Sequence, residues 1–88
     1  MAKNIAFVLI NTELGSEREV LAALRKLSEV KEAYFVFGVY DIIARIESDS
    51  VERLKEVVNL NIRSLGKVRS TLTMMSAEIS KIEDPISV

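Results

Sequence analysis

The sequence predicts an α+β fold in which four antiparallel strands form one sheet and two helices cover one of its faces. Two observations lead to this prediction. Strand-like and helix-like hydrophobic patterns follow one another in the order β-α-β-β-α-β along the 88 residues. The pattern Leu-x-x-Val-basic also occurs twice, at residues 27–31 and 65–69, between the helix and the last strand of each half. The length permits one domain, and a hydrophobic share of 49% is too high for a disordered chain.

The first half begins with an apolar strand, expected over residues 4–11. A helix is expected to begin at Ser16, because Glu19 stands three residues later and the pair has the form of a capping box. The apolar side chains of this helix recur at helical spacing and should face the sheet. They are Val20, Leu21, Leu24 and Leu27.

A hairpin is expected in the middle of the chain. The second strand is predicted over residues 33–37, which are rich in aromatic and β-branched side chains, and the third over residues 40–46. Only a tight turn at Gly38 separates them, so the two strands should be antiparallel neighbours. A positive φ angle would explain a glycine at this position.

The second half contains a helix and the last strand. Asp49 or Ser50 is expected to cap the helix, and Gly66 is expected to end it. Its apolar stripe advances by three or four residues at a time. The stripe consists of Val51, Leu54, Val58, Ile62 and Leu65. The fourth strand is predicted from residue 69 to residue 75, with a continuation to Ile79 left open.

Right-handed crossovers place these strands in the order 4-1-3-2, with both helices on one face of the sheet. This is the ferredoxin-like architecture, in which the first and third strands lie inside the sheet. Both of these strands are strongly apolar, as inner strands should be. We therefore assign residues 1–80 to the domain and residues 81–88 to a C-terminal tail.

Two helices can cover only one face of such a sheet, and the other face should be polar if it meets water. Here both parities of the strands are mostly apolar: Ile5, Phe7 and Leu9 point away from Ala6, Val8 and Ile10, and Leu72 and Met74 point away from Thr71, Thr73 and Met75. An uncovered apolar face of about 400–600 Å² is more than soluble monomers usually expose. We expect a homodimer that packs sheet to sheet about a two-fold axis. The alternative is that the C-terminal tail folds over this face as a lid.

The composition argues against catalysis. The chain has no His and no Cys, so the commonest general base and the commonest metal ligands are missing. No spacing typical of a zinc, calcium or phosphate-binding motif occurs. We expect no enzymatic activity, no metal and no cofactor.

Charge and hydropathy exclude two further classes of partner. Twelve basic residues balance 13 acidic ones, which argues against nucleic-acid binding through bulk charge. RNA-recognition domains share this strand order, but their third strand carries stacking aromatic side chains, whereas residues 40–46 are mostly aliphatic. The longest apolar run, residues 5–10, is far shorter than the roughly 20 residues of a membrane-spanning helix. We expect no membrane association and a cytoplasmic location.

Two stretches of the sequence resemble a known family. The first comprises residues 29–34 and the run Gly38-Val39-Tyr40-Asp41-Ile42-Ile43, and the second comprises residues 62–74, with Val68-x-x-Thr71-x-Thr73 inside it. Together they are similar to the effector-binding domain of the Lrp/AsnC (feast/famine) transcriptional regulators, called RAM for regulation of amino acid metabolism. The resemblance spans residues 4–80 and implies a ferredoxin-like fold.

The resemblance also implies a ligand, which is a free amino acid. The expected effector-binding residues are Gly38, Val39, Tyr40, Asp41, Thr71 and Thr73. The hairpin backbone would donate to the ligand carboxylate, the aspartate would pair with its ammonium group, and the threonine hydroxyls would add polar contacts. The resemblance further implies sheet-to-sheet dimers that join into rings such as octamers, with the effector bound where dimers meet.

Full-length regulators of this family carry an N-terminal helix-turn-helix domain, whereas the first strand here is expected within five residues of Met1. The expectation is a stand-alone effector domain that binds no DNA specifically by itself and joins other copies or full-length Lrp/AsnC regulators. A trimmed fragment of a longer regulator is the other interpretation.

Two alternatives of different class stay open: an ACT-like regulatory domain that serves a metabolic enzyme, and a small dimeric α+β barrel enzyme of the oxygenase or isomerase type.

Overall fold

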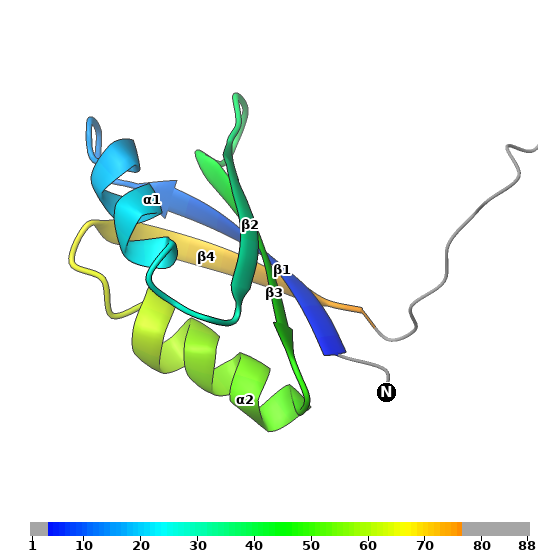
Figure 1. Ribbon diagram of the computed structural model, residues 1–88. Helices are drawn as coiled ribbons and strands as arrows, with labels where there is room; N and C mark the ends of the chain where they lie inside the picture. The colour runs from blue at the N-terminus through cyan, green and yellow to red at the C-terminus, as the bar shows by residue number, and fades with distance from the viewer. Residues whose placement is uncertain (1–3, 77–88) are drawn as a thin grey trace, which may run out of the picture.

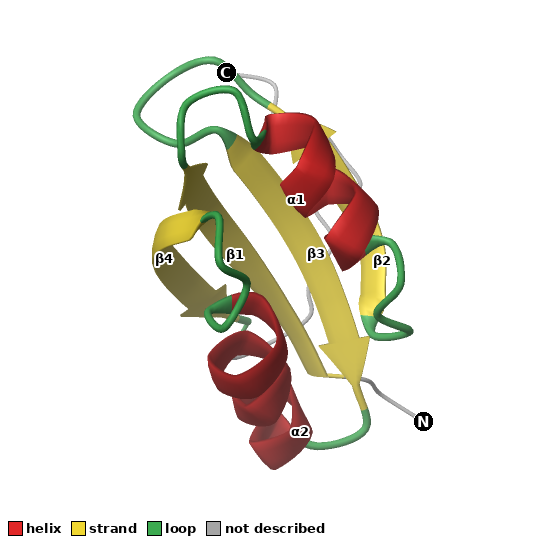
Figure 2. Cartoon of the chain, turned by 90° about the vertical axis from the view of Figure 1, so that its left-hand side faces the viewer, coloured by secondary structure: helices red, strands yellow, loops and turns green. Residues whose placement is uncertain are grey.

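The structure, a computed structural model, describes residues 4–76. Its elements are β1 (Asn4–Thr12), α1 (Glu17–Leu24), β2 (Val30–Phe35), β3 (Ile42–Ser48), α2 (Val51–Glu56), η1 (Val57–Ile62) and β4 (Val68–Met75). The strands form one antiparallel sheet in the order β2-β3-β1-β4, and both helices lie on the same face of it (Figures 1 and 2). The predicted ferredoxin-like fold and strand order are confirmed. The expected tail and any strand continuation beyond residue 76 lie outside the described residues.

The core lies between the two inner strands and the helices. Alternate side chains of β1 and β3 are fully buried on the helix-covered face, as the pleat of a strand requires. The core cluster consists of Ala6, Val8, Ile10, Val20, Leu21, Leu24, Ile42, Ala44, Ile46, Leu54, Val57, Val58 and Ile62. Each fully buried Leu, Ile or Val contributes about 1.5–3 kcal/mol through removal of its surface from water. This cluster fixes the relative positions of the strand ends that carry the candidate site.

The β2–β3 connection is longer than predicted. β2 ends at Phe35 and β3 begins at Ile42, so residues 36–41 form a loop in place of a tight turn at Gly38. The backbone N of Val36 donates to the O of Asp41 at 2.9 Å and closes this loop, which extends beyond the sheet (Figure 1). The strand-like composition of residues 36–40 misled the prediction, because strand propensity reflects packing on a half-buried surface that this loop lacks. Gly38 has a φ of 156°, so the expected positive φ is confirmed.

The first helix has Ser16 at its N-cap as predicted, but its capping hydrogen bond and its end differ from the prediction. The Ser16 side chain makes no capping hydrogen bond, so the predicted capping box with Glu19 is wrong. The helix ends at Leu24, earlier than the apolar stripe indicated. Leu27 lies beyond the helix but still packs against the core, which explains why its hydrophobic spacing fitted the stripe.

The second helix changes its hydrogen-bonding pattern half-way. Ser50 caps it as predicted, by accepting a hydrogen bond from the backbone N of Arg53 at 3.1 Å. After α2 the chain continues as the π-helix η1, and the N of Arg63 donates to the O of Val58, five residues earlier. The helix therefore ends at Ile62 and not at Gly66, and the predicted end is wrong. No helix in residues 4–76 is long and apolar enough to cross a membrane.

The face of the sheet opposite the helices is apolar, and we call it the open face. It is formed by Ile5, Phe7, Leu9, Tyr34, Ile43, Leu72 and Met74, whose parity follows from the strand register. Phe7 stands opposite Met74 on β4, and Leu9 stands opposite Leu72. Met74 is 51% exposed and Leu72 is 47% exposed. The predicted division of apolar side chains between two faces is confirmed.

A small ionic cluster interrupts the open face. Arg45 on β3 donates from Nε to Glu32 at 3.0 Å, and its Nη1 binds Glu47. These hydrogen bonds raise the pKa of Arg45 above its ordinary value, and the bond from Arg45 lowers the pKa of Glu32. The cluster satisfies the cation with carboxylates of β2 and β3 on the same face.

A second ion pair ties the start of β2 to α2 and makes stability depend on pH. Arg53 Nε lies 2.8 Å from Glu29 Oε2, and this hydrogen bond lowers the pKa of Glu29. A carboxyl group whose pKa is lower in the folded state stabilises the fold above its unfolded pKa of about 4.3. That contribution is lost as the pH falls through the folded pKa.

Glu29→Gln should therefore lower the free energy of unfolding at pH 7 by up to about 1 kcal/mol, the range of partly exposed ion pairs. The difference from the wild type should narrow as the pH falls below about 4, because the wild-type carboxyl then becomes protonated. Urea denaturation at pH 7 and at pH 3 measures the difference in the free energy of unfolding between the variant and the wild type. Glu52→Gln on the exposed side of α2 is the control. A difference that stays constant between the two pH values would contradict the role of this pair.

Candidate functional site

Asp41 joins the β2–β3 loop to the end of β1. Its Oδ2 accepts hydrogen bonds from the backbone N of Thr12 at 2.9 Å and from Thr12 Oγ1 at 3.4 Å. Its own backbone N donates to the O of Ile10 at 3.0 Å. Thr12 is buried, so Asp41 supplies acceptors for polar groups that water reaches poorly. Oδ1 makes no hydrogen bond within residues 4–76, and a carboxylate can accept several more.

The loop above Asp41 presents unpaired backbone donors. Within the described part of the chain, the amides of Gly38, Val39 and Tyr40 make no hydrogen bond. The loop tip is solvent-exposed, and the apolar side chains of Phe37 and Val39 are almost fully exposed. Successive free amides of this kind favour anionic groups.

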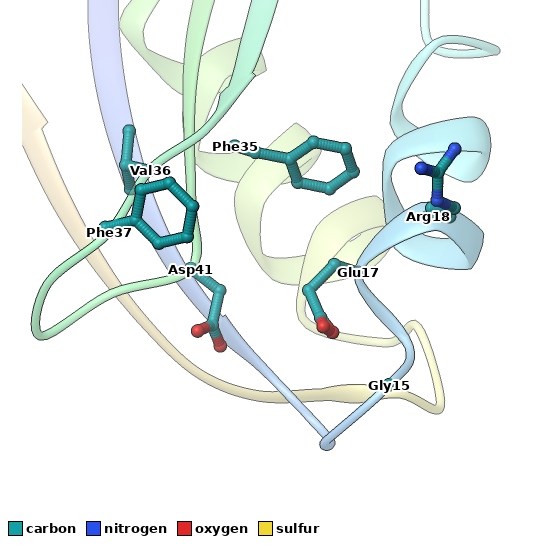
Figure 3. A pocket seen from close by; sticks show the side chains of 7 residues that line it. All are labelled: Gly15, Glu17, Arg18, Phe35, Val36, Phe37 and Asp41. Atoms are coloured by element: carbon teal, nitrogen blue, oxygen red, sulfur yellow. The ribbon is translucent and has the colours of Figure 1, made fainter.

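A cavity of about 380 Å³ lies on the α1 side of Asp41. It is lined by Gly15, Glu17, Arg18, Phe35, Val36, Phe37 and Asp41 (Figure 3). The carboxylates of Glu17 and Asp41 come from opposite sides of this space, one from the start of α1 and the other from the loop before β3 (Figure 3). Glu17 Oε1 is buried and has no hydrogen-bond partner among the described residues. The lining thus combines two acidic groups and one arginine with two phenyl rings.

Two more polar cavities adjoin Asp41 and the start of β4. One of about 440 Å³ is lined by Asn11, Thr12, Asp41, Arg69 and Ser70. The other, of about 250 Å³, is lined by Arg63, Val68, Arg69, Ser70 and Thr71. Asp41 borders the first of these as well as the cavity beside α1, and Arg69 borders both polar cavities. The end of the sheet therefore carries a graded series of charges, from acidic beside α1 to basic beside η1.

The six expected effector-binding residues do not all meet within one chain. Asp41 borders two of the cavities and Thr71 borders the third. Thr73 lies further along β4, on the helix-covered side, opposite Val8. Gly38 and Val39 lie at the loop tip, and none of these three cavities contains both the loop amides and Thr73. The roles expected for these residues stay predictions.

The structure adds residues that the sequence interpretation missed, above all Arg69 and Arg63. The register of β1 against β4 shifts between Asn11 and Thr12, so that Val68 and Ser70 are paired and Arg69 between them is not. Such a bulge redirects a side chain. No sequence pattern indicated the direction of the Arg69 side chain, because the bulge breaks the alternation of side chains along the strand. Among the described residues, no group of three or more acidic, His or Cys side chains forms a metal site.

Comparison with known proteins assigns this domain to a family. The sequence model of the Lrp/AsnC ligand binding domain matches residues 5–86. The chain belongs to the Lrp/AsnC ligand-binding domain family. It is 31% identical over 77 residues to the HTH-type transcriptional regulator FL11 of Pyrococcus furiosus, a match that covers 88% of this chain and 50% of FL11. The chain thus spans about half the length of the curated relatives it matches.

Solved structures with similar sequences have the same fold. FFRP-DM1 superposes with a TM-score of 0.81 at 40% identity, over 83% of this chain and 97% of that one. TTHA0845 from Thermus thermophilus superposes with a TM-score of 0.85 at 33% identity, over 90% and 99%. The regulator NMB0573 from Neisseria meningitidis, solved as a complex with L-Met, shares the fold with a TM-score of 0.78 at 18% identity, over 97% and 55%.

The family assignment decides between the alternatives left open by the sequence. The matched family is a regulatory ligand-binding domain and its named relatives are transcriptional regulators. The chain is therefore a Lrp/AsnC regulatory domain and not an enzyme of the dimeric α+β barrel type. The family match likewise disfavours the ACT-like alternative.

Two substitutions separate the hydrogen bonds that Asp41 accepts from Thr12 from the charge of its carboxylate. Asp41→Ala leaves the buried Thr12 amide without its acceptor and should lower the free energy of unfolding by about 1–3 kcal/mol. Asp41→Asn removes the charge but keeps a side-chain oxygen that can accept from Thr12. Its decrease in the free energy of unfolding should therefore be clearly smaller than that of Asp41→Ala. Urea denaturation compares the two variants. Equal decreases in the free energy of unfolding for the two variants would contradict a stabilising role of the acceptor oxygen that Asp41 offers to Thr12.

Proposed function

We propose that this Lrp/AsnC domain is an amino-acid-sensing module that self-associates and modulates transcription through the state of its assembly. The observation that carries the proposal is the pairing of the free loop amides at residues 38–40 with Asp41, whose Oδ1 is unused within the described chain. A free amino acid needs donors for its carboxylate and an acceptor for its ammonium group, and this end of the sheet offers both. Charge-assisted hydrogen bonds of this kind are roughly twice as strong as neutral ones.

The class of ligand is supported by a protein of the same fold. NMB0573 was solved in complex with L-Met, an amino acid. In this chain the partly buried hydroxyls of Thr71 and Thr73 lie on the helix-covered side of β4 and are candidates for further polar contacts with such a ligand.

The open face supports sheet-to-sheet dimerisation. Its apolar side chains lie next to one another on three neighbouring strands, and several are about half exposed in the single chain. Hiding an apolar face of about 400–600 Å² on each chain contributes on the order of 10 kcal/mol before the costs of association. A two-fold axis lets the same face serve both partners.

The loop tip supports a second level of assembly. Phe37 and Val39 are almost fully exposed, which is unusual for apolar side chains that have no partner. The loop amides and the two threonines do not border one cavity in a single chain, so a complete effector site needs residues from two chains. We infer that dimers meet at this loop and form a ring such as an octamer, with the effector between them.

Effector binding would act on transcription by shifting the population of assembly states. A ligand shifts such an equilibrium only as far as its affinities for the two states differ, and a ligand bound between chains meets that condition. Mixed rings with full-length Lrp/AsnC regulators then carry the signal to DNA, in the cytoplasm, through the partner's recognition helix.

A thermal-unfolding screen against the twenty amino acids tests the sensing function. An effector present at about 100 times its Kd should add about 2.7 kcal/mol of stability. For a domain of this size, that raises Tm by on the order of 10 °C. Asp41→Asn should roughly halve the increase or reduce it further, because the ammonium group loses its charged partner and the affinity falls about tenfold or more. If no amino acid raises Tm, the sensing function is wrong.

Analytical ultracentrifugation at micromolar concentration tests the assembly. Met74→Glu places a charge in the open face and should convert dimers, or rings of dimers, into smaller species. Leu60→Glu on η1 is the matched control, because Leu60 is 67% exposed on an element that lies on the opposite side of the sheet. A wild-type chain that sediments as a monomer would contradict the dimer.

A further inference from the structure

Two arginines at the basic end of the candidate site have no counter-charge among the described residues. Arg63 and Arg69 border the same cavity of about 250 Å³, together with the hydroxyls of Ser70 and Thr71. No acidic side chain of residues 4–76 lines this cavity. Its chemistry is that of an anion site, with guanidinium groups and hydroxyls as hydrogen-bond donors.

Three other cations of the described chain are paired with carboxylates. Arg45 and Arg53 each bind two carboxylates, and Lys67 pairs with Glu13 at 3.8 Å. Within residues 4–76, by contrast, Arg63 donates only to Asn59 Oδ1 at 3.4 Å, and the guanidinium of Arg69 has no hydrogen-bond or ion-pair partner. Two neighbouring guanidinium groups without carboxylates repel each other, and an anion between them removes that repulsion.

Both arginines are positioned by irregular backbone. Arg63 follows directly on the π-helix η1, and its amide makes the hydrogen bond to the O of Val58 that closes the last wide turn. Arg69 is the unpaired residue at the bulge between β1 and β4. π-turns and bulges both occur preferentially at functional sites, where they redirect side chains. Two independent irregularities therefore direct two cations toward one cavity.

Arg69 also connects this cavity to Asp41. The adjoining cavity of about 440 Å³ has Arg69 on one side and the Asp41 carboxylate on the other, with Asn11 and Ser70 between them. A ligand whose ammonium group binds Asp41 therefore extends toward Arg69, and beyond it toward Arg63. We propose that Arg63 and Arg69 bind a second carboxylate of the effector, so that this domain prefers a dicarboxylic amino acid. This inference rests on the proposed amino-acid-sensing function.

Isothermal titration calorimetry with L-glutamate and L-glutamine tests the preference, because these ligands have the same shape and differ in the side-chain charge. L-aspartate and glutarate, which has two carboxylates and no ammonium group, complete the set. The wild type should bind L-glutamate or L-aspartate at least about tenfold more tightly than L-glutamine, the discrimination expected of charge-assisted hydrogen bonds. Arg63→Gln/Arg69→Gln should bring this ratio close to one, because it weakens the binding of L-glutamate more than that of L-glutamine. Arg25→Gln, an exposed cation of α1's C-terminal end, is the matched control and should leave the ratio unchanged.

The outcomes separate this inference from the function on which it rests. Equal binding of L-glutamate and L-glutamine by the wild type would overturn the dicarboxylate preference and leave amino-acid sensing intact. A third outcome is that glutarate binds as tightly as L-glutamate and that the double variant loses this binding. It would support the anion site but overturn the sensing function at Asp41. No binding of any of these ligands overturns the dicarboxylate preference, and the thermal-unfolding screen against all twenty amino acids then decides whether the sensing function fails with it. Both arginines are exposed, and a thermal melt of the double variant verifies that it is folded.

Discussion

The inner strand β1 carries apolar side chains on both faces and β3 adds Ile43 to the open face, whereas two helices can bury only one face of the sheet. The helix-covered face forms a closed core in which side chains from β1, β3, α1, α2 and η1 are fully buried. The other face is left for contact outside the chain. The candidate site lies at the ends of the strands and in the β2–β3 loop. These are the places where backbone and polar groups are available outside the buried core and the apolar part of the open face.

Asp41 is the residue at which fold and site meet. Its hydrogen bonds to Thr12 hold the loop against the end of β1, and this attachment determines where the free amides of the loop tip lie. The same carboxylate lies beside Arg69 across a polar cavity. A residue with both tasks cannot be assessed by removal alone, since loss of the hydrogen bonds to Thr12 disturbs the backbone that presents the amides. The charge and the hydrogen bonds have to be changed separately.

Much of this domain was predictable from the sequence, and what was not has physical causes. The order of the elements and right-handed crossovers predicted the order of the strands, and the strand period of two predicted which side chains share a face. The helix ends were less predictable: Ser16 has the residue type of a cap without its hydrogen bond, and η1 widens a helix whose apolar spacing fits an α-helix. Asp41 was identified from its motif, but its partner Thr12 was not, because the contact joins residues far apart in the chain. The place of the Arg69 side chain depends on a bulge in the β1–β4 pairing, and a sequence pattern does not reveal such a bulge.

The position of Asp41 between two cavities has a consequence for anything that binds there. One carboxylate borders both the phenyl-lined space beside α1 and the polar space beside Arg69. A cation that binds Asp41 from one cavity neutralises the carboxylate charge that the other cavity would use. The two cavities therefore compete for the single negative charge of Asp41. Occupation of one weakens occupation of the other, and by thermodynamic reciprocity the penalty is the same in both directions. In the proposed sensing function, an ammonium group bound at Asp41 from one cavity would therefore exclude a second cation from the other.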